Sequence, residues 1–146
     1  MATVASILKD KGYKVYWVSP ETTIVDCLKL MNEKQIGSVL VMKDDCVIGI
    51  FSERDYAWRG ILKGNDANTP VEKVMTEKVY YVKPEQSAET CMAQMSDKHI
   101  SHLPVLQEGK VVGVISIGDV VKTLLQDKES LIKGLENYIL EGVIEL

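Results

Sequence analysis

The 146-residue chain contains the same segment twice. Residues 14–56 align with residues 78–120 at a constant shift of 64 positions without a gap, and 15 of these 43 positions are identical. A repeat of this kind means that one supersecondary unit is used twice. Two similar units usually face each other across a pseudo-twofold axis, which creates paired clefts. We therefore expect the functional site to lie in such clefts.

Composition indicates a small protein with one good core, because 46% of the residues are apolar. No apolar run approaches membrane-spanning length, and the N-terminus lacks the charged and apolar regions of a signal peptide. We expect a cytoplasmic protein that does not associate with membranes. A net charge of −4 argues against general nucleic-acid binding, although it leaves room for a local basic pocket.

Each repeat predicts a strand, a helix, two strands and a second helix. In the first copy, a strand at 15–18 precedes a helix capped by Thr22 or Thr23, whose apolar positions recur at helical spacing. Two β-rich runs at 39–42 and 47–51 flank a polar turn, which indicates a hairpin with largely buried strands. The last helix begins near Ser52, since hydroxyl and acidic residues favour a helix N-terminus.

The flanking segments predict further helices. We expect one in the first eleven residues and a short one at 71–75, in the matching place before the second repeat. The predicted boundaries are 1–66 for repeat 1 with its N-terminal helix, 67–127 for repeat 2, and 128–146 for a C-terminal helix. That last segment carries an apolar stripe that would cover either the domain's own core or a neighbouring subunit. The stripe consists of Leu131, Leu135, Tyr138 and Ile139.

The cysteines and histidines indicate no metal site. Cys27 and Cys91 occupy equivalent positions on apolar helix faces, so we interpret them as small buried hydrophobic residues. Cys46 completes an odd number without metal-ligand spacing. His99 and His102 are three residues apart, but they lie on either side of a predicted helix end and strand start. We predict no bound metal.

Two heptapeptides carry a family resemblance: Gly49 to Asp55 and Gly113 to Asp119 both read Gly, two apolar residues, Ser, two variable residues and Asp. Together with Val18-Ser19-Pro20, Val82-Lys83-Pro84 and His102-Leu103-Pro104-Val105, the chain resembles a tandem pair of cystathionine-β-synthase (CBS) domains. One heptapeptide is weak evidence, whereas two at one spacing are strong. The resemblance covers nearly the whole chain, so we expect no attached enzyme or transporter domain.

This resemblance implies an α/β (α+β) fold, in which two β-α-β-β-α repeats pack through their sheets into one pseudo-twofold module that commonly forms a homodimer. Such modules bind adenosyl compounds, most often AMP, ADP or ATP and less often S-adenosylmethionine or dinucleotides. AMP is the ligand we most expect. Each cleft of the family is shared, because the Gly-to-Asp segment of one repeat meets the first strand of the other.

The acidic and hydroxyl residues of the heptapeptides suit a nucleotide. A carboxylate at a helix start, as at Asp55 and Asp119, accepts hydrogen bonds from two vicinal hydroxyls of a ribose. Ser52 and Ser116, with helix N-terminal amides, suit a phosphate. Two alternatives stay open: both aspartates could be helix caps only, and Tyr16 and Tyr80 could be core edge rather than pocket wall.

The shared-cleft rule of the family groups the candidate residues into two sites. The first comprises Ser52, Arg54, Asp55, Lys78, Tyr80, Ser101 and His102, with Pro104 beside them. The second comprises Ser116, Asp119, Lys14, Tyr16, Gly37 and Ser38. Since the first holds more positive charge, we expect it to bind the phosphate of a nucleotide more tightly. Loss of binding in Asp119→Ala with retention in Asp55→Ala would contradict this.

We consider three functions: a sensor, a scaffold and an enzyme. The expected one is a non-enzymatic adenine-nucleotide sensor that modulates an unidentified partner protein in trans. The alternatives to it are a dimerisation or scaffold module with non-functional clefts, and a sensor of another adenosyl ligand, NAD or S-adenosylmethionine. An enzyme is not expected, because the chain has no phosphate-binding Gly-Lys-Ser/Thr loop, no Gly-x-Ser-x-Gly elbow and no His-Glu-x-x-His.

Overall fold

A computed structural model describes residues 2–126 of the chain, and it confirms the α+β fold class. The C-terminal stripe and the helix expected at 128–146 lie outside the described residues. In chain order the elements are α1 (Val4–Lys11), β1 (Trp17–Val18), α2 (Ile24–Lys34), β2 (Ser38–Lys43), β3 (Cys46–Ser52), α3 (Glu53–Asp55), a π-helical turn (Tyr56–Gly60), two 3-10 turns (Ile61–Lys63 and Val71–Lys73), α4 (Ala88–Lys98), β4 (His102–Gln107), β5 (Lys110–Ser116) and α5 (Ile117–Gln126).

The chain divides into two compact units, and each contains a segment from the flank of the other repeat. One unit comprises 14–81 with 106–112, and the other comprises 2–13, 82–105 and 113–126. Segment 71–81 therefore packs with repeat 1, where the backbone N–H of Ile50 donates to the carbonyl of Thr76. In the same way α1 packs with repeat 2, where the N–H of Val4 donates to the carbonyl of Gln86 at 2.8 Å.

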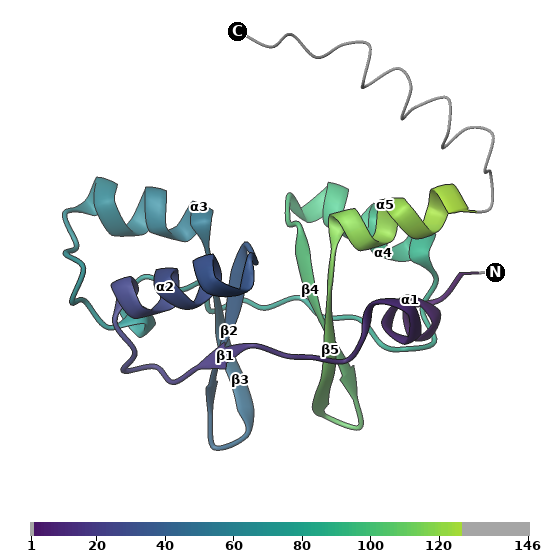
Figure 1. Cartoon of the computed structure of the whole chain (residues 1–146), viewed down its shortest axis with the longest axis horizontal. Coiled ribbons are helices and arrows are strands. Elements are labelled where there is room, and N and C mark those ends of the chain that lie inside the picture. Colours follow the sequence, from purple (N-terminus) through teal and green to yellow (C-terminus); the bar gives the residue numbers. More distant parts are fainter. Residues whose placement is uncertain (1, 127–146) are drawn as a thin grey trace, which may run out of the picture. The chain divides into compact units, whose positions relative to one another are not determined.

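In the first unit, a three-stranded sheet carries α2 and α3 (Figure 1). β1 pairs with β2 in parallel, and β2 pairs with β3 in antiparallel register with an irregularity between Val41 and Met42. Apolar side chains from the sheet, from α2 and from 71–75 form one core. Its buried members are Val18, Ile24, Cys27, Met31, Val39, Val41, Phe51, Val71, Val74 and Met75.

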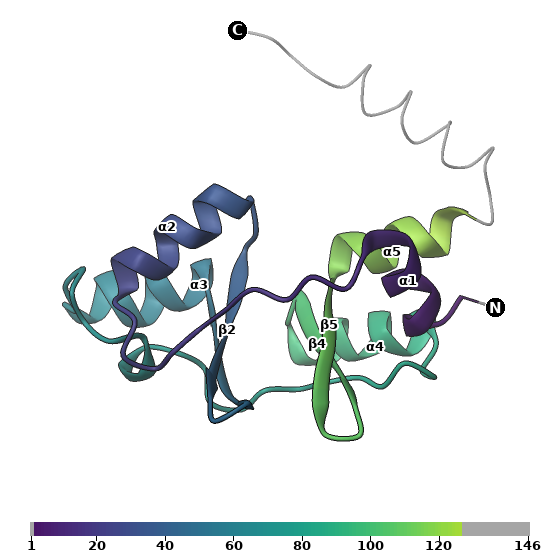
Figure 2. The same ribbon diagram turned by 60° about the horizontal axis from the view of Figure 1, so that its bottom comes forward.

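In the second unit, α1, α4 and α5 lie beside the parts of β4 and β5 that belong to it, 102–105 and 113–116, and α1 contacts α5 (Figure 2). The strand expected before α4 is reduced to one parallel bridge between Val82 and Val105. The reason lies at Pro104. Its equivalent in repeat 1, Leu40, donates its N–H to the carbonyl of Tyr16, whereas proline has no N–H to donate.

The first helix of each repeat uses the same signals. Thr23 caps α2 and Ser87 caps α4, and each side chain accepts the N–H three residues on. Gln35 and His99 end these helices in the left-handed conformation, both at φ +54°. Cys27 and Cys91 are completely buried, as predicted. None of the helices within residues 2–126 combines the length and apolar character needed to cross a bilayer.

Candidate functional site

A capping box begins α3 and fixes the Asp55 carboxylate. The N–H of Ser52 donates to Asp55 Oδ2 at 2.9 Å, and the N–H of Asp55 donates back to Ser52 Oγ at 3.3 Å. The Ser52 hydroxyl also donates to Oδ2, at 3.0 Å. The capping role of Asp55 is thus observed, and its contact with a ligand stays a prediction.

Thr76 completes the environment of Asp55. Its hydroxyl donates to Oδ1 at 2.8 Å, and its backbone pairs with Ile50 of β3. Asp55 is only 8% exposed, which is unusual for an acid. The donors around it offset the cost of burying this polar group, because a carboxyl group accepts several hydrogen bonds. The result is an acceptor positioned by hydrogen bonds at the start of α3.

Repeat 2 builds the same box and adds a full positive charge. The N–H of Ser116 donates to Asp119 Oδ2 at 2.8 Å, and the N–H of Asp119 donates to Ser116 Oγ at 3.1 Å. The ammonium of Lys11, at the end of α1, lies 2.6 Å from the same Oδ2 and 2.8 Å from the carbonyl of Val114. Lys11 and Asp119 form an ion pair whose side chains are 34% and 24% exposed.

The contacts of Asp119 set the charge of its carboxylate. Burial acts to raise the pKa of Asp119, but the hydrogen bonds from Lys11 and Ser116 and the charge of Lys11 outweigh it. The pKa therefore lies below its ordinary value of 3.8. At neutral pH this carboxylate is therefore ionised.

The predicted lysine and tyrosine residues form matched pairs. The Lys14 ammonium lies 5.7 Å from the centre of the Tyr16 ring, and the Lys78 ammonium lies 5.4 Å from that of Tyr80. Lys34 of α2 also approaches the Tyr16 ring, at 5.7 Å. Both tyrosines are half-buried, and Tyr16 packs against the core of repeat 1, so a core-edge position is observed for it.

Arg54, predicted to meet a phosphate, lies over an exposed aromatic ring. Its guanidinium carbon is 5.3 Å from the centre of the Trp58 ring, and this tryptophan is 61% exposed. Such a cation–π contact contributes about 0.5–1 kcal/mol at an exposed site. Trp58, one turn further along the helix, therefore contributes to the position of Arg54.

The strand-entry residues lie beside the heptapeptide of their own repeat. Ser38 pairs with Ser52 across β2 and β3, and the N–H of Glu53 donates to the carbonyl of Gly37 at 3.3 Å. In repeat 2 the N–H of Ile117 donates to the carbonyl of Ser101 at 2.8 Å. The hydroxyl of Ser101 lies 3.1 Å from His102 Nδ1. The predicted grouping of these residues with the other repeat's heptapeptide stays a prediction.

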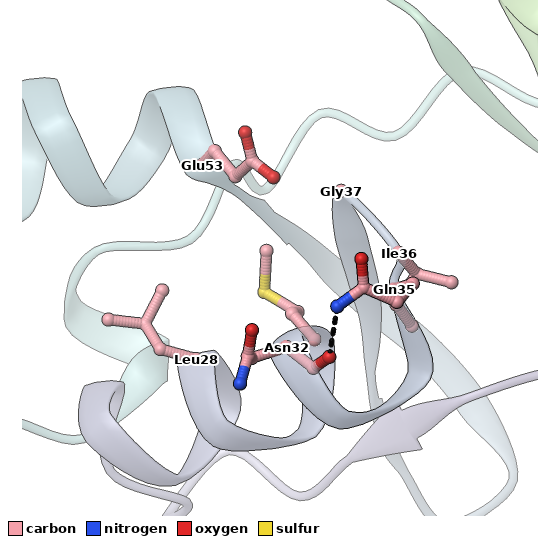
Figure 3. Close-up of a pocket in the computed structure, with 7 residues that line it drawn as sticks. Leu28, Asn32, Gln35, Ile36, Gly37 and Glu53 are labelled. Atoms are coloured by element: carbon pink, nitrogen blue, oxygen red, sulfur yellow. Dashed lines mark hydrogen bonds between the residues drawn. The ribbon is translucent and has the colours of Figure 1, made fainter.

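A groove of about 340 Å³ adjoins this region in repeat 1 (Figure 3). It runs between the C-terminal half of α2 and the start of α3, and the Gln35 amide donates to the carbonyl of Asn32 along its wall. Its volume is at the lower end of those that hold small molecules. The lining residues are Leu28, Met31, Asn32, Gln35, Ile36, Gly37 and Glu53, of which Gly37 was a predicted ligand residue.

The family model of the CBS domain matches residues 4–57 and 71–126, which together make up most of the chain. This chain belongs to the CBS-domain family. CBS domain pairs are regulatory ligand-binding modules, and proteins built only from them are generally regulatory rather than catalytic. Residues 4–57 and 71–126 each correspond to one CBS repeat together with the helix that precedes it.

Relatives support this assignment. A structure of a CBS-domain protein from Burkholderia ambifaria MC40-6 is 46% identical with a TM-score of 0.83, covering 87% of this chain and 96% of that one. The mitochondrial CBS domain-containing protein CBSX3 of Arabidopsis thaliana is 31% identical over 150 residues, which is 96% of this chain and 73% of that one. The CBS domain pair of protein MJ0100, solved with 5′-methylthioadenosine and S-adenosyl-L-methionine, shares 19% identity at a TM-score of 0.78 and covers 88% and 99%.

Sequence reasoning missed two residues of these CBS sites, Thr76 and Lys11. Both precede the aligned repeats at 14 and 78, so neither fell inside the segment that was compared. Extending the shift of 64 backward would have paired the wrong positions, because Val4 and Val71 make the equivalent backbone contacts, to Gln86 and Thr22. The alignment of the repeats therefore gave no signal that Lys11 and Thr76 reach the aspartates.

Within residues 2–126, no cluster of three or more potential metal-binding side chains occurs. The two histidines of the second CBS repeat have separate structural places. His99 ends α4 in the left-handed conformation, and the ring of His102 meets the Ser101 hydroxyl at the entry to β4.

Proposed function

We propose that this CBS domain pair is a non-enzymatic sensor that binds an adenine nucleotide, AMP before ADP or ATP, and modulates a partner protein in trans. The observation that carries the proposal is the pair of Ser-x-x-Asp capping boxes. Each holds a carboxyl group beside helix N-terminal amides and a serine hydroxyl, at Asp55 and at Asp119. A vicinal diol and an anionic group are the chemistry that such an arrangement accepts.

The complex of the MJ0100 pair supports the adenosyl part of the proposal, because both of its ligands carry an adenosyl group. Ligand contact at Asp55 or Asp119 must bias the packing around β3 or β5 if the module is to signal. A ligand shifts such an equilibrium only by its differential affinity for two states. Since Thr76 and Lys11 come from outside the aligned repeats, a ligand at either carboxylate also affects how 71–81 or α1 is held.

Calorimetric titration of the nucleotide-stripped chain with AMP, ATP, NAD and S-adenosylmethionine tests the proposal. We expect micromolar binding of AMP, about −8 kcal/mol. Asp55→Asn and Asp119→Asn retain the size of the side chain and remove its charge, so either should weaken binding at its own site by about tenfold or more. No heat with any of these ligands, from folded protein, would overturn the sensor.

The sequence predicted that the two sites bind phosphate with unequal strength. The site containing Arg54 and His102 was expected to bind it more tightly, because Lys14 was the only cation of the other site. Lys11 adds a second cation at Asp119. Titration of Asp55→Asn beside Asp119→Asn ranks the two sites directly, and a greater loss in Asp55→Asn would support the original ranking.

Exposed apolar side chains support the alternative, a module whose main role is association, and they also support a homodimer. Trp58, Ile61 and Leu62 are 61%, 60% and 74% exposed and follow α3 closely. Such clustering is typical of interaction surfaces. Leu62→Glu should convert a dimer to a monomer in light scattering, whereas Tyr13→Glu, changing a similarly exposed residue, should not. A monomeric wild-type chain would remove this support.

The cysteines bear on the cellular location. The three cysteines, Cys27, Cys46 and Cys91, are all free thiols in the structure. Free thiols suit a reducing compartment, where adenine nucleotides also circulate. We propose that the module acts in the cytoplasm, and fractionation of cells expressing a tagged chain tests this.

A further inference from the structure

Lys11 gives the acid of repeat 2 a different electrostatic environment from the acid of repeat 1. The backbone contacts of the flanks place Lys11 opposite Lys78, because Val4 donates to Gln86 as Val71 donates to Thr22. The Lys78 ammonium, however, lies over the Tyr80 ring. Around Asp55 the donors are the neutral groups of Ser52 and Thr76. Around Asp119 they are the N–H of Ser116 and the ammonium of Lys11. The two equivalent sites therefore differ by one full positive charge placed directly at the carboxylate.

The ion pair can be exchanged at little cost. Both side chains are partly exposed, at 34% and 24%, and pairs of this kind contribute only about 0–1 kcal/mol. Lysine carries its charge on a flexible four-carbon stem, so the ammonium can follow a new anion. In a 5′-nucleotide, the phosphate is attached through C5′ to the ring carbon beside the one that carries the 3′-hydroxyl. A ribose bound at Asp119 thus brings a 5′-phosphate near Lys11.

We propose that Lys11 selects the ligand of the repeat-2 site, pairing with Asp119 in the free chain and with the phosphate of the ligand in the bound chain. This inference rests on the proposed function and names its ligand class: adenosyl compounds with an anionic 5′ group. A neutral nucleoside would separate Lys11 from Asp119 without offering a replacement anion. A sulfonium ligand such as S-adenosylmethionine would bring a positive charge toward the ammonium.

The second contact of Lys11 links ligand exchange to α1. Its ammonium also donates to the carbonyl of Val114 in β5, beside Gly113 against which Leu8 of α1 packs. When the ammonium moves to a phosphate, both bonds that hold the end of α1 to this region are lost. The amides of Lys11 and Gly12 should therefore respond to AMP together with those of Ser116 and Asp119.

The experiment is a titration followed by amide NMR, in which the Ser116 and Asp119 signals report repeat 2 and the Ser52 and Asp55 signals report repeat 1. The probes are AMP, adenosine and S-adenosylmethionine. The variants are Lys11→Met, which removes the charge and keeps an unbranched side chain, Lys11→Arg, which keeps the charge, and Lys9→Met as a matched change in the same last turn of α1. Methionine and arginine are good helix formers, so α1 should persist in each.

In the wild type we expect the repeat-2 signals to show at least a tenfold preference for AMP over adenosine, equivalent to about 1.4 kcal/mol. Lys11→Met should reduce this preference to within about threefold, while Lys11→Arg and Lys9→Met keep it. An unchanged preference in Lys11→Met, or equal AMP and adenosine affinity in the wild type, would overturn the proposal. Response of the repeat-1 signals alone would also overturn it and leave the sensor intact, whereas silence of both sets in folded protein would overturn both.

Discussion

Thr76 donates a 2.8 Å hydrogen bond to Oδ1 of Asp55, joining two residues 21 positions apart. The bond ties segment 71–81 to the helix start of repeat 1, at a carboxylate that is 8% exposed. In repeat 2 the corresponding tie is ionic and comes from Lys11. The two repeats thus stabilise equivalent buried or half-buried aspartates with different hydrogen-bond donors.

Replacing Thr76 by valine should destabilise the chain by about 1–3 kcal/mol, because it leaves a buried carboxylate without one donor while keeping the side-chain shape. The midpoint of urea unfolding measures this. Thr69→Val is the matched control, since the Thr69 hydroxyl makes an exposed contact of 3.4 Å with Asp66. Equal effects of the two substitutions would show that the Thr76 bond adds nothing.

Gly113→Ala should also destabilise the protein, by about 1–3 kcal/mol, since an added Cβ would lie 2.5 Å from Cδ2 of the buried Leu8. Thermal unfolding measures the change. The double variant Gly113→Ala with Leu8→Ala should lose less than the sum of the two single changes, because the smaller side chain makes room. Additive losses would show that Leu8 is not the obstacle.

Only one cysteine should react quickly with a thiol reagent in the folded protein. Burial, and to a lesser extent the Asp26 carboxylate, raise the pKa of Cys27 to about 11, and burial raises the pKa of Cys91. Cys46 is exposed. Ellman's reagent at pH 8 should therefore modify one thiol rapidly, and Cys46→Ser should abolish that phase. Three thiols reacting at one rate in native protein would contradict the buried placement.

The Lys11–Asp119 pair should stabilise the fold in a pH-dependent way. The pKa of Asp119 is lower in the folded chain than its ordinary 3.8, so the unfolded chain binds this proton more tightly. The contribution is complete above pH 3.8 and is lost as the pH falls through the folded-state pKa. The difference in unfolding midpoint between wild type and Asp119→Asn should thus be larger at pH 6 than at pH 2.5.

A control separates this effect from general acid denaturation. Asp10→Asn is the matched control, because it removes an exposed acid of α1 next to Lys11 and leaves the Lys11–Asp119 pair in place. In Lys11→Met the pH dependence should be smaller, since the group that lowers the Asp119 pKa most is gone. A constant gap for Asp119→Asn at both pH values would count against the pair.

The local elements were predictable because their signals are local. Helical spacing of Ile24, Cys27 and Met31 defined the buried face of α2, and all three are buried. Ser52 and Ser116 marked the starts of α3 and α5. The helices expected in the first eleven residues and at 71–75 are present as α1 and a 3-10 turn. The strand expected before α4 is only a bridge between Val82 and Val105, because Pro104 has no N–H to donate to it. This effect depends on which strand lies beside Pro104, so the local sequence did not reveal it.

By itself the sequence determined the repeat, the order of elements, the buried helix faces and the family, because periodicity and capping depend on residues a few positions apart. Only the tertiary structure decided what surrounds the two aspartates. Thr76 reaches Asp55 from 21 positions away, and Lys11 reaches Asp119 from 108 positions away. No local pattern encodes such contacts. They arise because each repeat packs against the flanking segment of the other, and that packing brings a neutral hydroxyl to one carboxylate and an ammonium to its equivalent.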